Sequence, residues 1–342
     1  MNSPNTACVS RRRSIHPRGS TDILAQAVIA STNNDTMLVV GDTTIDLYPT
    51  DNGSIAPGSN LEWHIGGTAT NVARWAAVLD CEVDLMTNHG TDVMGELAAE
   101  HLANGPVGTS HVTQVDTTSP LTLYTGAQGD EEWNAWVTGS CYGFTPPDNP
   151  AALLADHNWV HLEGVTLPAE VNQTAVLRLA ETAAANATHV SFDLNGRENQ
   201  WDTPDDYRET LEDVLPYCDL IFAGKDDLEV AAVNPTPAGL RTLLPADHSA
   251  RAFITAGDRE TIALQMEDGE IVEQVNVTPP EVTVATPAGA GDAFAGAVLA
   301  ARCDGITDLH ELATIGNTAG AAAVVTVGPY GSDSVATMDQ LF

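Results

Sequence analysis

Short apolar runs that alternate with alanine-rich stretches are the feature that most limits the fold of this chain. Five of these runs lie at residues 82–88, 158–162, 188–193, 219–222 and 251–255. Another run, MLVVGD, begins at Met37. The runs have the length of buried strands, and the stretches between them have the composition of helices. The alternation predicts an α/β fold of three layers, α/β/α, with a mainly parallel, doubly wound sheet.

Two stretches, residues 44–65 and 112–139, break this alternation. In the second stretch apolar residues stand among Thr, Gly and Asp, and they are Val112, Val115, Leu121, Leu123, Trp133, Trp136 and Val137. We expect both stretches to supply strands of a small β-sheet, a lid that projects from the main layer. Pairing of the lid strands between two chains would give a homodimer.

The first 36 residues differ from the rest. They hold four arginines, at positions 11, 12, 13 and 18, and an apolar stretch at 23–30 that is short for the core of a signal peptide. We predict a disordered extension over 1–36 and one catalytic domain over 37–342. A twin-arginine export signal is the alternative for the extension.

Charge limits the class of partner. The chain has 47 acidic and 13 basic residues, a formal net charge of -34, and Lys225 is its only lysine. Nucleic acids and anionic membranes are bound through Lys and Arg, so neither is an expected partner. Folded proteins of this charge suit concentrated salt, where the Debye length falls to roughly 3 Å. The five cysteines show no metal-binding spacing and indicate free thiols in a cytoplasmic, halophilic protein.

The strongest local motif is TPAGAGDAFAGAVLAA at residues 286–301, in which a glycine-rich turn leads directly into a helix. The helix is expected to begin at about Gly291. The amides of Gly289, Ala290, Gly291 and Asp292 then point at one spot, with the helix dipole behind them, which is a phosphate cradle.

Asp292 is a carboxylate inside this predicted anion site. Its expected task is to take a proton from an attacking hydroxyl while the amides hold the transferred phosphoryl group. An ordinary first-turn carboxylate is the alternative.

GAGDAF, together with GGTATNVA at residues 66–73, resembles the two signatures of the phosphofructokinase B (PfkB) family of ribokinase-like carbohydrate kinases. The resemblance spans about 37–330. It implies an α/β/α domain with a β-lid that transfers the γ-phosphoryl group of ATP to a sugar hydroxyl. It also implies Mg²⁺ and a monovalent cation such as K⁺ as cofactors.

On the sugar side, the resemblance implies that Gly66 and Gly67 let the chain pass beside the substrate and that Asn71 binds its hydroxyls. Helix capping is the alternative for Asn71. Asp46, five residues after Gly41, matches the sugar-binding aspartate of the family. Tyr124 in the lid is a further substrate-binding candidate.

The stretch SFDLNGRENQW, residues 191–201, resembles the strand end of fructokinases and 2-keto-3-deoxygluconate kinases. Asp193, Asn195 and Arg197 are expected to face one side of that exit. Asn195 is assigned to the cofactor, and Arg197 to the charge of the transferred phosphoryl group. A surface salt bridge is the alternative for Arg197.

The nucleotide and metal side departs from the family pattern at four positions. Gly224 stands where an Asn is usual, and Asp227 replaces the Glu that helps to hold magnesium. Glu260 and Thr286 replace a glycine and an aspartate. Three residues are expected at the nucleotide, and they are Thr255, Gly257 and Asn317.

Fructose or a related ketohexose is the first choice of substrate, followed by 2-keto-3-deoxygluconate and ribose. The absence of an arginine from the lid sequence favours a neutral sugar. A non-catalytic sugar- or nucleotide-binding regulator is the alternative of another class. A Rossmann dehydrogenase is disfavoured because its glycine-rich turn follows the first strand.

Overall fold

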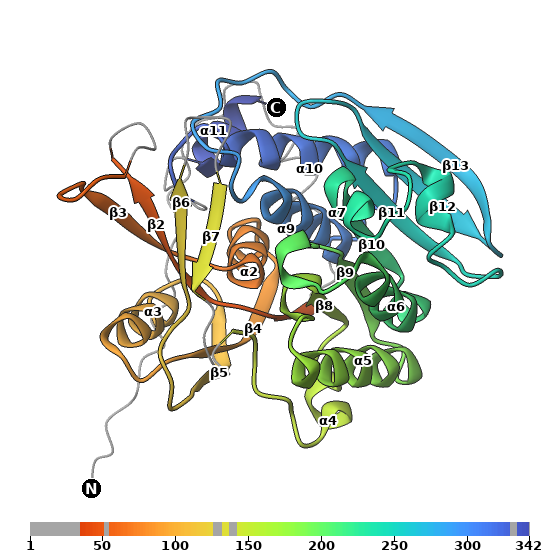
Figure 1. The fold of residues 1–342 in the computed structure, drawn as a ribbon. Helices are drawn as coiled ribbons and strands as arrows, with labels where there is room; N and C mark the ends of the chain where they lie inside the picture. Colours follow the sequence, from red (N-terminus) through yellow and green to blue (C-terminus); the bar gives the residue numbers. More distant parts are fainter. Residues whose placement is uncertain (1–34, 51–54, 126–131, 137–141, 329–333, 342) are drawn as a thin grey trace, which may run out of the picture. The chain divides into compact units, whose positions relative to one another are not determined.

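The computed structural model of the chain describes residues 35–50, 55–125, 132–136, 142–328 and 334–341 (Figure 1). The predicted N-terminal extension lies outside this part of the chain, apart from its last two residues. Among the described residues, no helix has the length and apolar character that are needed to cross a membrane.

A nine-stranded sheet forms the middle layer, in the order β13-β12-β11-β10-β9-β8-β1-β4-β5. The strands are β1 (Thr36–Val40), β4 (Glu82–His89), β5 (Gly108–Gln114), β8 (Trp159–Glu163), β9 (His189–Asp193), β10 (Leu220–Gly224), β11 (Ala250–Thr255), β12 (Thr261–Glu267) and β13 (Glu270–Val277). Pairing is parallel from β5 to β11, and β12 and β13 are antiparallel additions at one edge. The predicted parallel sheet is confirmed.

Helices cover both faces of this sheet (Figure 1). Helix α9 packs on both α2 and α10, and α2 also contacts β1 and β4. Helix α5 packs on α4 and α6 and against β8 and β9. The helices are α2 (Thr68–Val78), α3 (Val93–Ala103), α4 (Pro150–Leu154), α5 (Glu170–Ala185), α6 (Pro204–Val214), α7 (Lys225–Val230), α8 (Pro237–Arg241), α9 (Ala290–Cys303), α10 (Leu309–Ala323) and α11 (Ser334–Leu341).

Strand β10 shows why the sheet needs two helical layers. Successive side chains of a strand point to opposite faces. Ile221 and Ala223 join the core cluster that includes the buried residues of α5 and α6. Phe222 points the other way and meets Phe294 of α9 at a centroid distance of 6.2 Å. Both faces of the strand are therefore apolar, as a doubly covered parallel sheet requires.

A separate four-stranded sheet forms the lid, in the order β3-β2-β6-β7. Its strands are β2 (Thr44–Pro49), β3 (Leu61–Gly66), β6 (Leu121–Thr125) and β7 (Glu132–Trp136). Pairs β2–β3 and β6–β7 are antiparallel, and β2–β6 is parallel. Two lid assignments need correction, because Val112 lies in β5 and pairs with Thr87 in the large sheet, and Val115 directly follows β5. Val137 lies outside the described residues.

Candidate active site

A cavity of 470 Å³ opens at the carboxyl ends of the parallel strands. Asp193, Gly224 and Thr255 are the last residues of β9, β10 and β11, and all three line it. This edge is where open α/β sheets bind ligands. The predicted site residues that line the cavity are Asp46, Gly67, Asn71, Tyr124, Asn195, Arg197, Asp227, Thr255, Gly289, Ala290, Gly291 and Asp292.

The glycine-rich turn lies at the N-terminus of α9, where the sequence predicts a phosphate cradle. Gly289 has a φ of 81°, in the left-handed region that favours glycine, and it ends the turn directly before the helix. A Cβ built on Gly291 would meet no atom within 4 Å. The space beside this first-turn amide is therefore open to a ligand, and the helix dipole favours an anion there.

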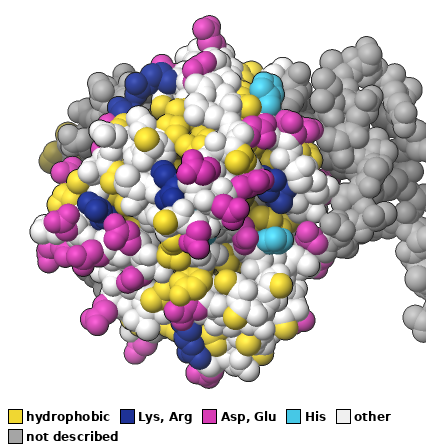
Figure 2. All heavy atoms as spheres, turned by 90° about the vertical axis from the view of Figure 1, so that its right-hand side faces the viewer, with side chains coloured by type: hydrophobic (Ala, Val, Ile, Leu, Met, Phe, Trp, Pro, Cys, Tyr) yellow, Lys and Arg dark blue, Asp and Glu magenta, His cyan; other side chains and the backbone are white. Residues whose placement is uncertain are grey.

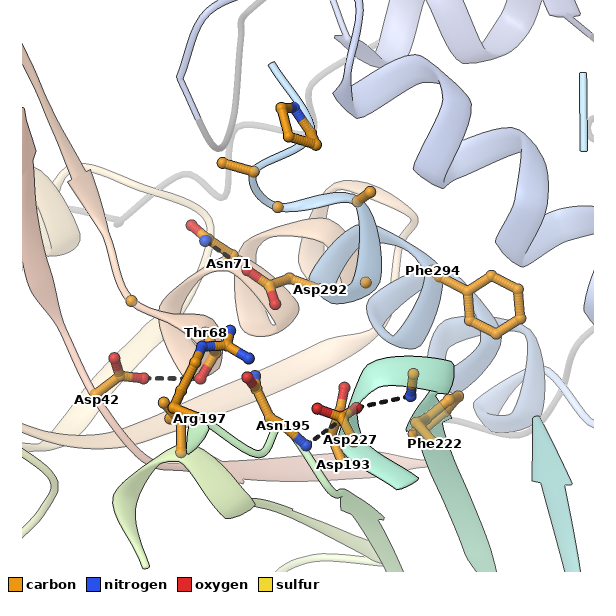
Figure 3. A pocket seen from close by; sticks show the side chains of 18 of the residues that line it. Asp42, Thr68, Asn71, Asp193, Asn195, Arg197, Phe222, Asp227, Asp292 and Phe294 are labelled. Carbon is orange, nitrogen blue, oxygen red and sulfur yellow. Dashed lines mark hydrogen bonds between the residues drawn. The ribbon is translucent and has the colours of Figure 1, made fainter. Parts of the chain in front are cut away.

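Asp292 and Asn71 meet across the cavity from distant parts of the chain (Figure 3). The Nδ2 of Asn71 donates to Oδ2 of Asp292 over 2.7 Å. Asn71 does not cap α2, because the N-cap of that helix is Gly67 and no side chain bonds the cap. The Oδ1 of Asn71 is buried and has no hydrogen-bond partner among the described residues.

Burial is the main cause of the electrostatics of Asp292. Desolvation, followed by the charge of Glu163, raises the pKa of Asp292 to about 8, while the hydrogen bond from Asn71 opposes the rise. A carboxyl group with this pKa exchanges a proton near neutral pH. It therefore has the property required of a general base.

Two aspartates that follow β1, Asp42 and Asp46, line the cavity where the sequence predicts sugar binding. Asp46 lines the cavity and accepts a hydrogen bond from Thr44 over 2.7 Å, and desolvation raises its pKa to about 7. Asp42 also lines the cavity, and its Oδ1 accepts from Thr68 Oγ1 over 2.9 Å. Sequence reasoning missed Asp42, although the same GDTTID motif carries it.

The two glycines before α2 differ in their relation to the site. Gly67 lines the cavity with a φ of 101°, and a Cβ there would lie 2.6 Å from the carbonyl oxygen of Asp42. Gly66 does not belong to the cavity lining of the described residues. Its role is indirect, because a Cβ on Gly66 would clash with the carboxylate of Asp46.

The exit of β9 brings Arg197 into the cavity, which rules out the surface salt bridge as its setting (Figure 3). Burial alone would lower the pKa of Arg197, but Asp227, Tyr142 and Asp292 raise it. Arg197 is the one cation in the cavity lining of the described residues. It therefore faces several carboxylates and any bound anion.

Asp227 lies in the cavity lining, with both oxygens engaged. Its Oδ1 accepts from the amide of Gly196 and its Oδ2 from the amide of Gly224, each over 2.7 Å. Burial raises its pKa to about 6, against the effect of Arg197. Carboxylate oxygens have further lone pairs, so these bonds leave capacity for the water shell of a magnesium ion.

Of the three residues predicted to bind the nucleotide, only one lines the cavity of the described residues. Thr255 lines the cavity, whereas Gly257 does not belong to the lining of the described residues. The side chain of Asn317 accepts from Thr261 Oγ1 over 2.6 Å and donates to the carbonyl of Val277 over 3.0 Å. This amide joins α10 to β12 and β13, so the predicted adenine contact finds no support in the geometry.

The departures from the family pattern have local roles. Thr286 is buried, and its hydroxyl accepts from the amide of Ala288 over 3.2 Å, within the turn before the cradle. Glu260 accepts from Asn276 Nδ2 over 3.2 Å. Lys225 pairs with Glu229 at 3.3 Å on α7.

A family model described as pfkB family carbohydrate kinase matches residues 34–335. A fructokinase of Klebsiella pneumoniae is 26% identical over 314 residues, which cover 88% of this chain and 98% of that protein. A 2-dehydro-3-deoxygluconokinase of Dickeya dadantii is 26% identical over 270 residues, or 72% of this chain and 84% of that protein. The crystal structure of a fructokinase with bound ATP from Xylella fastidiosa superposes with a TM-score of 0.73 at 18% identity, covering 90% and 99% of the two chains.

Proposed function

Because the chain belongs to the pfkB family of carbohydrate kinases, we propose that it transfers the γ-phosphoryl group of ATP to a hydroxyl of fructose or a related ketohexose. Asp292 acts as the base in this proposal. A fructokinase among the relatives, aligned over nearly its whole length, supports the choice of sugar.

The observation that carries the proposal is the place of Asp292 on the first turn of α9, beside Gly291 and bonded to Asn71. The open amides of the turn receive the transferred phosphoryl group. A sugar hydroxyl that lies against the Asp292 carboxylate is then within reach of both the base and the phosphorus atom. Positioning and charge neutralisation supply most of the catalysis in such a reaction.

Magnesium fits the donors that are present. The cavity is lined by oxygen-bearing side chains, which this cation prefers, and Asp227 together with Asp193 would hold it through its water shell. When bound, the ion neutralises charge on the phosphates of ATP. Both carboxyl groups have raised pKa values because of burial, and a cation beside them favours their ionised forms. A monovalent cation such as K⁺ stays a prediction from the family resemblance.

Replacement of Asp292 by Asn tests the base directly. Asp292→Asn keeps the size of the side chain but cannot accept the hydroxyl proton. We expect binding of ATP to persist while turnover falls by roughly two to four orders of magnitude. Turnover is measured as ADP release with fructose, glucose, ribose and 2-keto-3-deoxygluconate in molar KCl with Mg²⁺.

Asp205→Asn is the matched control, since Asp205 is an exposed first-turn carboxylate on α6 outside the cavity. We expect this variant to keep normal turnover. Near-normal turnover of Asp292→Asn would contradict the role of the base. A folded wild-type protein without turnover on any sugar would favour the regulator.

2-Keto-3-deoxygluconate is the second candidate substrate, and the surroundings of Arg197 favour it. Tyr124 and Tyr142 line the same cavity, and Arg197 lowers the raised pKa of each phenol, so all three groups are within electrostatic reach of one another. A guanidinium beside two phenolic hydroxyls suits the carboxylate of an acid sugar. The absence of a lid arginine is therefore a weaker argument for a neutral sugar than the sequence suggested.

Arg197→Gln separates the two roles of the guanidinium. If Arg197 binds a substrate carboxylate, the KM for 2-keto-3-deoxygluconate rises at least tenfold and kcat changes little. If it stabilises the phosphoryl group, kcat falls with every sugar that the enzyme accepts. An unchanged KM for the acid sugar would rule out the first role.

A further inference from the structure

Two cysteines lie at the same end of two neighbouring helices. Cys81 follows the C-terminus of α2, and Cys303 is the last residue of α9. Both are free thiols; Cys303 is only 3% exposed, whereas Cys81 is partly exposed. Neither belongs to the cavity lining of the described residues. The opposite ends of the same two helices carry Asn71 and Asp292.

Helices α2 and α9 lie side by side and run in the same direction (Figure 1). At their N-terminal ends Asn71 bonds Asp292 over 2.7 Å. In the middle, Gly296 brings the backbones close, since a Cβ there would lie 2.7 Å from Cβ of Trp75 and from the carbonyl oxygen of Val72. Similar numbers of residues follow these contacts in both helices, so the two cysteines come level with each other.

The turn that ends α2 holds Cys81 against its helix. Asp80 has a φ of 69°, in the left-handed region, and the amide of Cys81 donates to the carbonyl oxygen of Ala76 over 3.1 Å. This is the Schellman arrangement, in which the chain folds back over the last helical turn. The side chains of Cys81 and Cys303 share a hydrogen bond, which, followed by burial, raises the pKa of the Cys303 thiol. The two sulfur atoms are therefore direct neighbours.

The surroundings of this pair favour a bond between the sulfurs over a metal ion. In the part of the chain that the structure describes, no group of three or more His, Cys, Asp or Glu side chains could hold a metal. Cys218, the other cysteine in that part, is 1% exposed and donates to the carbonyl oxygen of Val214 over 3.5 Å. Cys81 and Cys303 are thus a pair of partners, and Cys218 serves as a reference.

We propose that Cys81 and Cys303 form a reversible disulfide that ties the C-terminal end of α2 to that of α9 when a small organic disulfide acts as oxidant. The accessible Cys81 thiolate attacks one sulfur of the oxidant and releases a first small thiol. Cys303 then attacks Cys81 Sγ and releases the second. Two protein thiols are oxidised to one disulfide, and the oxidant is reduced to two thiols that carry the two protons. This inference does not depend on the proposed function.

The disulfide should stabilise the fold strongly because its two ends are distant in the chain. Cys81 and Cys303 lie more than 200 positions apart. A crosslink between distant residues restricts the unfolded chain, and its effect grows with the length of the closed loop. The native helices already hold the two thiols together. We therefore expect the Tm of the oxidised protein to exceed that of the reduced protein by at least about 5 °C.

Chemical mapping tests whether the bond forms. The full chain in 2 M KCl at pH 8.5 is treated with cystamine, a small disulfide, and is then denatured and alkylated with iodoacetamide without reduction. We expect two fewer alkylated cysteines than in protein kept in dithiothreitol, and a peptide linked through Cys81 and Cys303 in mass spectrometry. Later addition of dithiothreitol should restore both thiols. A lasting mixed disulfide at Cys81, a link to another cysteine, or unchanged alkylation would overturn the proposal.

Serine variants test whether this bond stabilises the fold. Cys81→Ser removes one partner at a partly exposed position, so it should fold, but its Tm should not rise after cystamine treatment. Cys218→Ser is the matched control, because it removes a cysteine outside the pair and should show the same rise as wild type. Melting is followed by circular dichroism in 2 M KCl after the excess cystamine is removed. An unchanged Tm of oxidised wild type, or an equal rise in Cys81→Ser, would overturn the proposal.

Discussion

At the scale of single residues, the site gathers buried carboxyl groups around one guanidinium. Asp46 and Asp292 have pKa values raised to about 7 and about 8, mainly by desolvation. Burial of such ionisable groups lowers the stability of the folded protein when they are charged, and it lets them exchange protons near neutral pH. The same burial that readies Asp292 as a base should therefore appear in both the kinetics and the stability of the protein.

The kinetic consequence is a rise of kcat/KM with pH. In the free enzyme Asp292 must lose its proton before it can accept one from the sugar, so kcat/KM should increase up to about pH 8 and then level off. Rates from pH 5.5 to 9.5 in molar KCl, with ATP saturated by Mg²⁺, give the profile. A rate that is flat across this range would contradict a titrating base with a raised pKa.

The stability consequence has the opposite sign to that of an ordinary salt-bridged carboxylate. The folded protein holds the proton of Asp292 up to about pH 8, whereas the unfolded chain releases it near pH 4, so this group lowers stability as pH rises between these values. The asparagine of the Asp292→Asn variant cannot ionise, so this variant does not lose stability in this way. We expect its Tm to exceed that of wild type by about 2 °C or more at pH 8, with a smaller difference at pH 5. Equal differences at the two pH values would contradict the assignment.

At the scale of elements, α9 links the cradle to the core. Gly289 supplies the left-handed turn, and the helix behind it packs on α2 and α10. Asn71 lies on the first turn of α2, so the two helices present their N-termini to the same cavity. The relative position of Asn71 and Asp292 is thus held by helix packing rather than by the turn alone.

Alanine substitutions separate the two glycines of the cradle. Gly291→Ala fits the helix and meets no protein atom, so stability should be kept while the methyl group enters the ligand space and the KM for ATP rises about tenfold or more. Gly289→Ala should also cost about 1 kcal/mol of stability, because its φ is 81°. Gly305→Ala is the control, with a φ of 86° beyond the other end of α9 and open surroundings. It should lose similar stability without a change in KM, and a normal KM for Gly291→Ala would contradict the cradle.

Elements with a strong apolar pattern could be predicted from the sequence. Strands that mix polar and apolar residues without a clear pattern could not. The apolar runs of β8 to β11 and the glycine-rich entry to α9 were recognisable because each pattern has a single physical reading. The strand β5, with the sequence GTSHVTQ, is half-exposed at an edge of the large sheet. Its composition is like that of the lid strands, so the sequence did not indicate to which sheet it belongs.

The same difference applies to the site residues: those in recognisable motifs could be predicted from the sequence, and those without a local pattern could not. Asp46, Asn71 and Asp292 lie in glycine-containing motifs, and all three line the cavity. Glu163 ends a buried strand in a run that otherwise reads as core, so only tertiary structure reveals its bond to His161. Asn317 was assigned to the nucleotide from its helix, but Thr261 and Val277 take both ends of its amide. Such pairing between distant elements has no local signal.

At the scale of the whole molecule, the main feature is the large negative net charge. Acidic side chains are spread over the face shown in Figure 2, and the full chain has a net charge of -34. Repulsion among these groups opposes the compact state in dilute buffer. The lining of the cavity also has more acidic than basic residues, with Arg197 as its one cation among the described residues.

Salt should therefore stabilise this protein. Raising KCl from 0.1 M to 2 M shortens the Debye length from roughly 10 Å to 3 Å or less, which screens the repulsion. We expect the Tm to rise by at least about 10 °C and kinase activity to require KCl near or above 1 M. Sucrose of equal osmolality is the control. A Tm that is independent of KCl would refute adaptation to salt.

The bond between Asn71 and Asp292 joins residues 221 positions apart. During synthesis on a ribosome, the chain emerges from its N-terminus and begins to fold from that end. The turn that carries Asn71 is therefore released long before Asp292, the proposed base, leaves the exit tunnel. A chain that ends before Asp292 lacks the residue that we propose as the base. Catalytic competence in this architecture is a property that translation confers last.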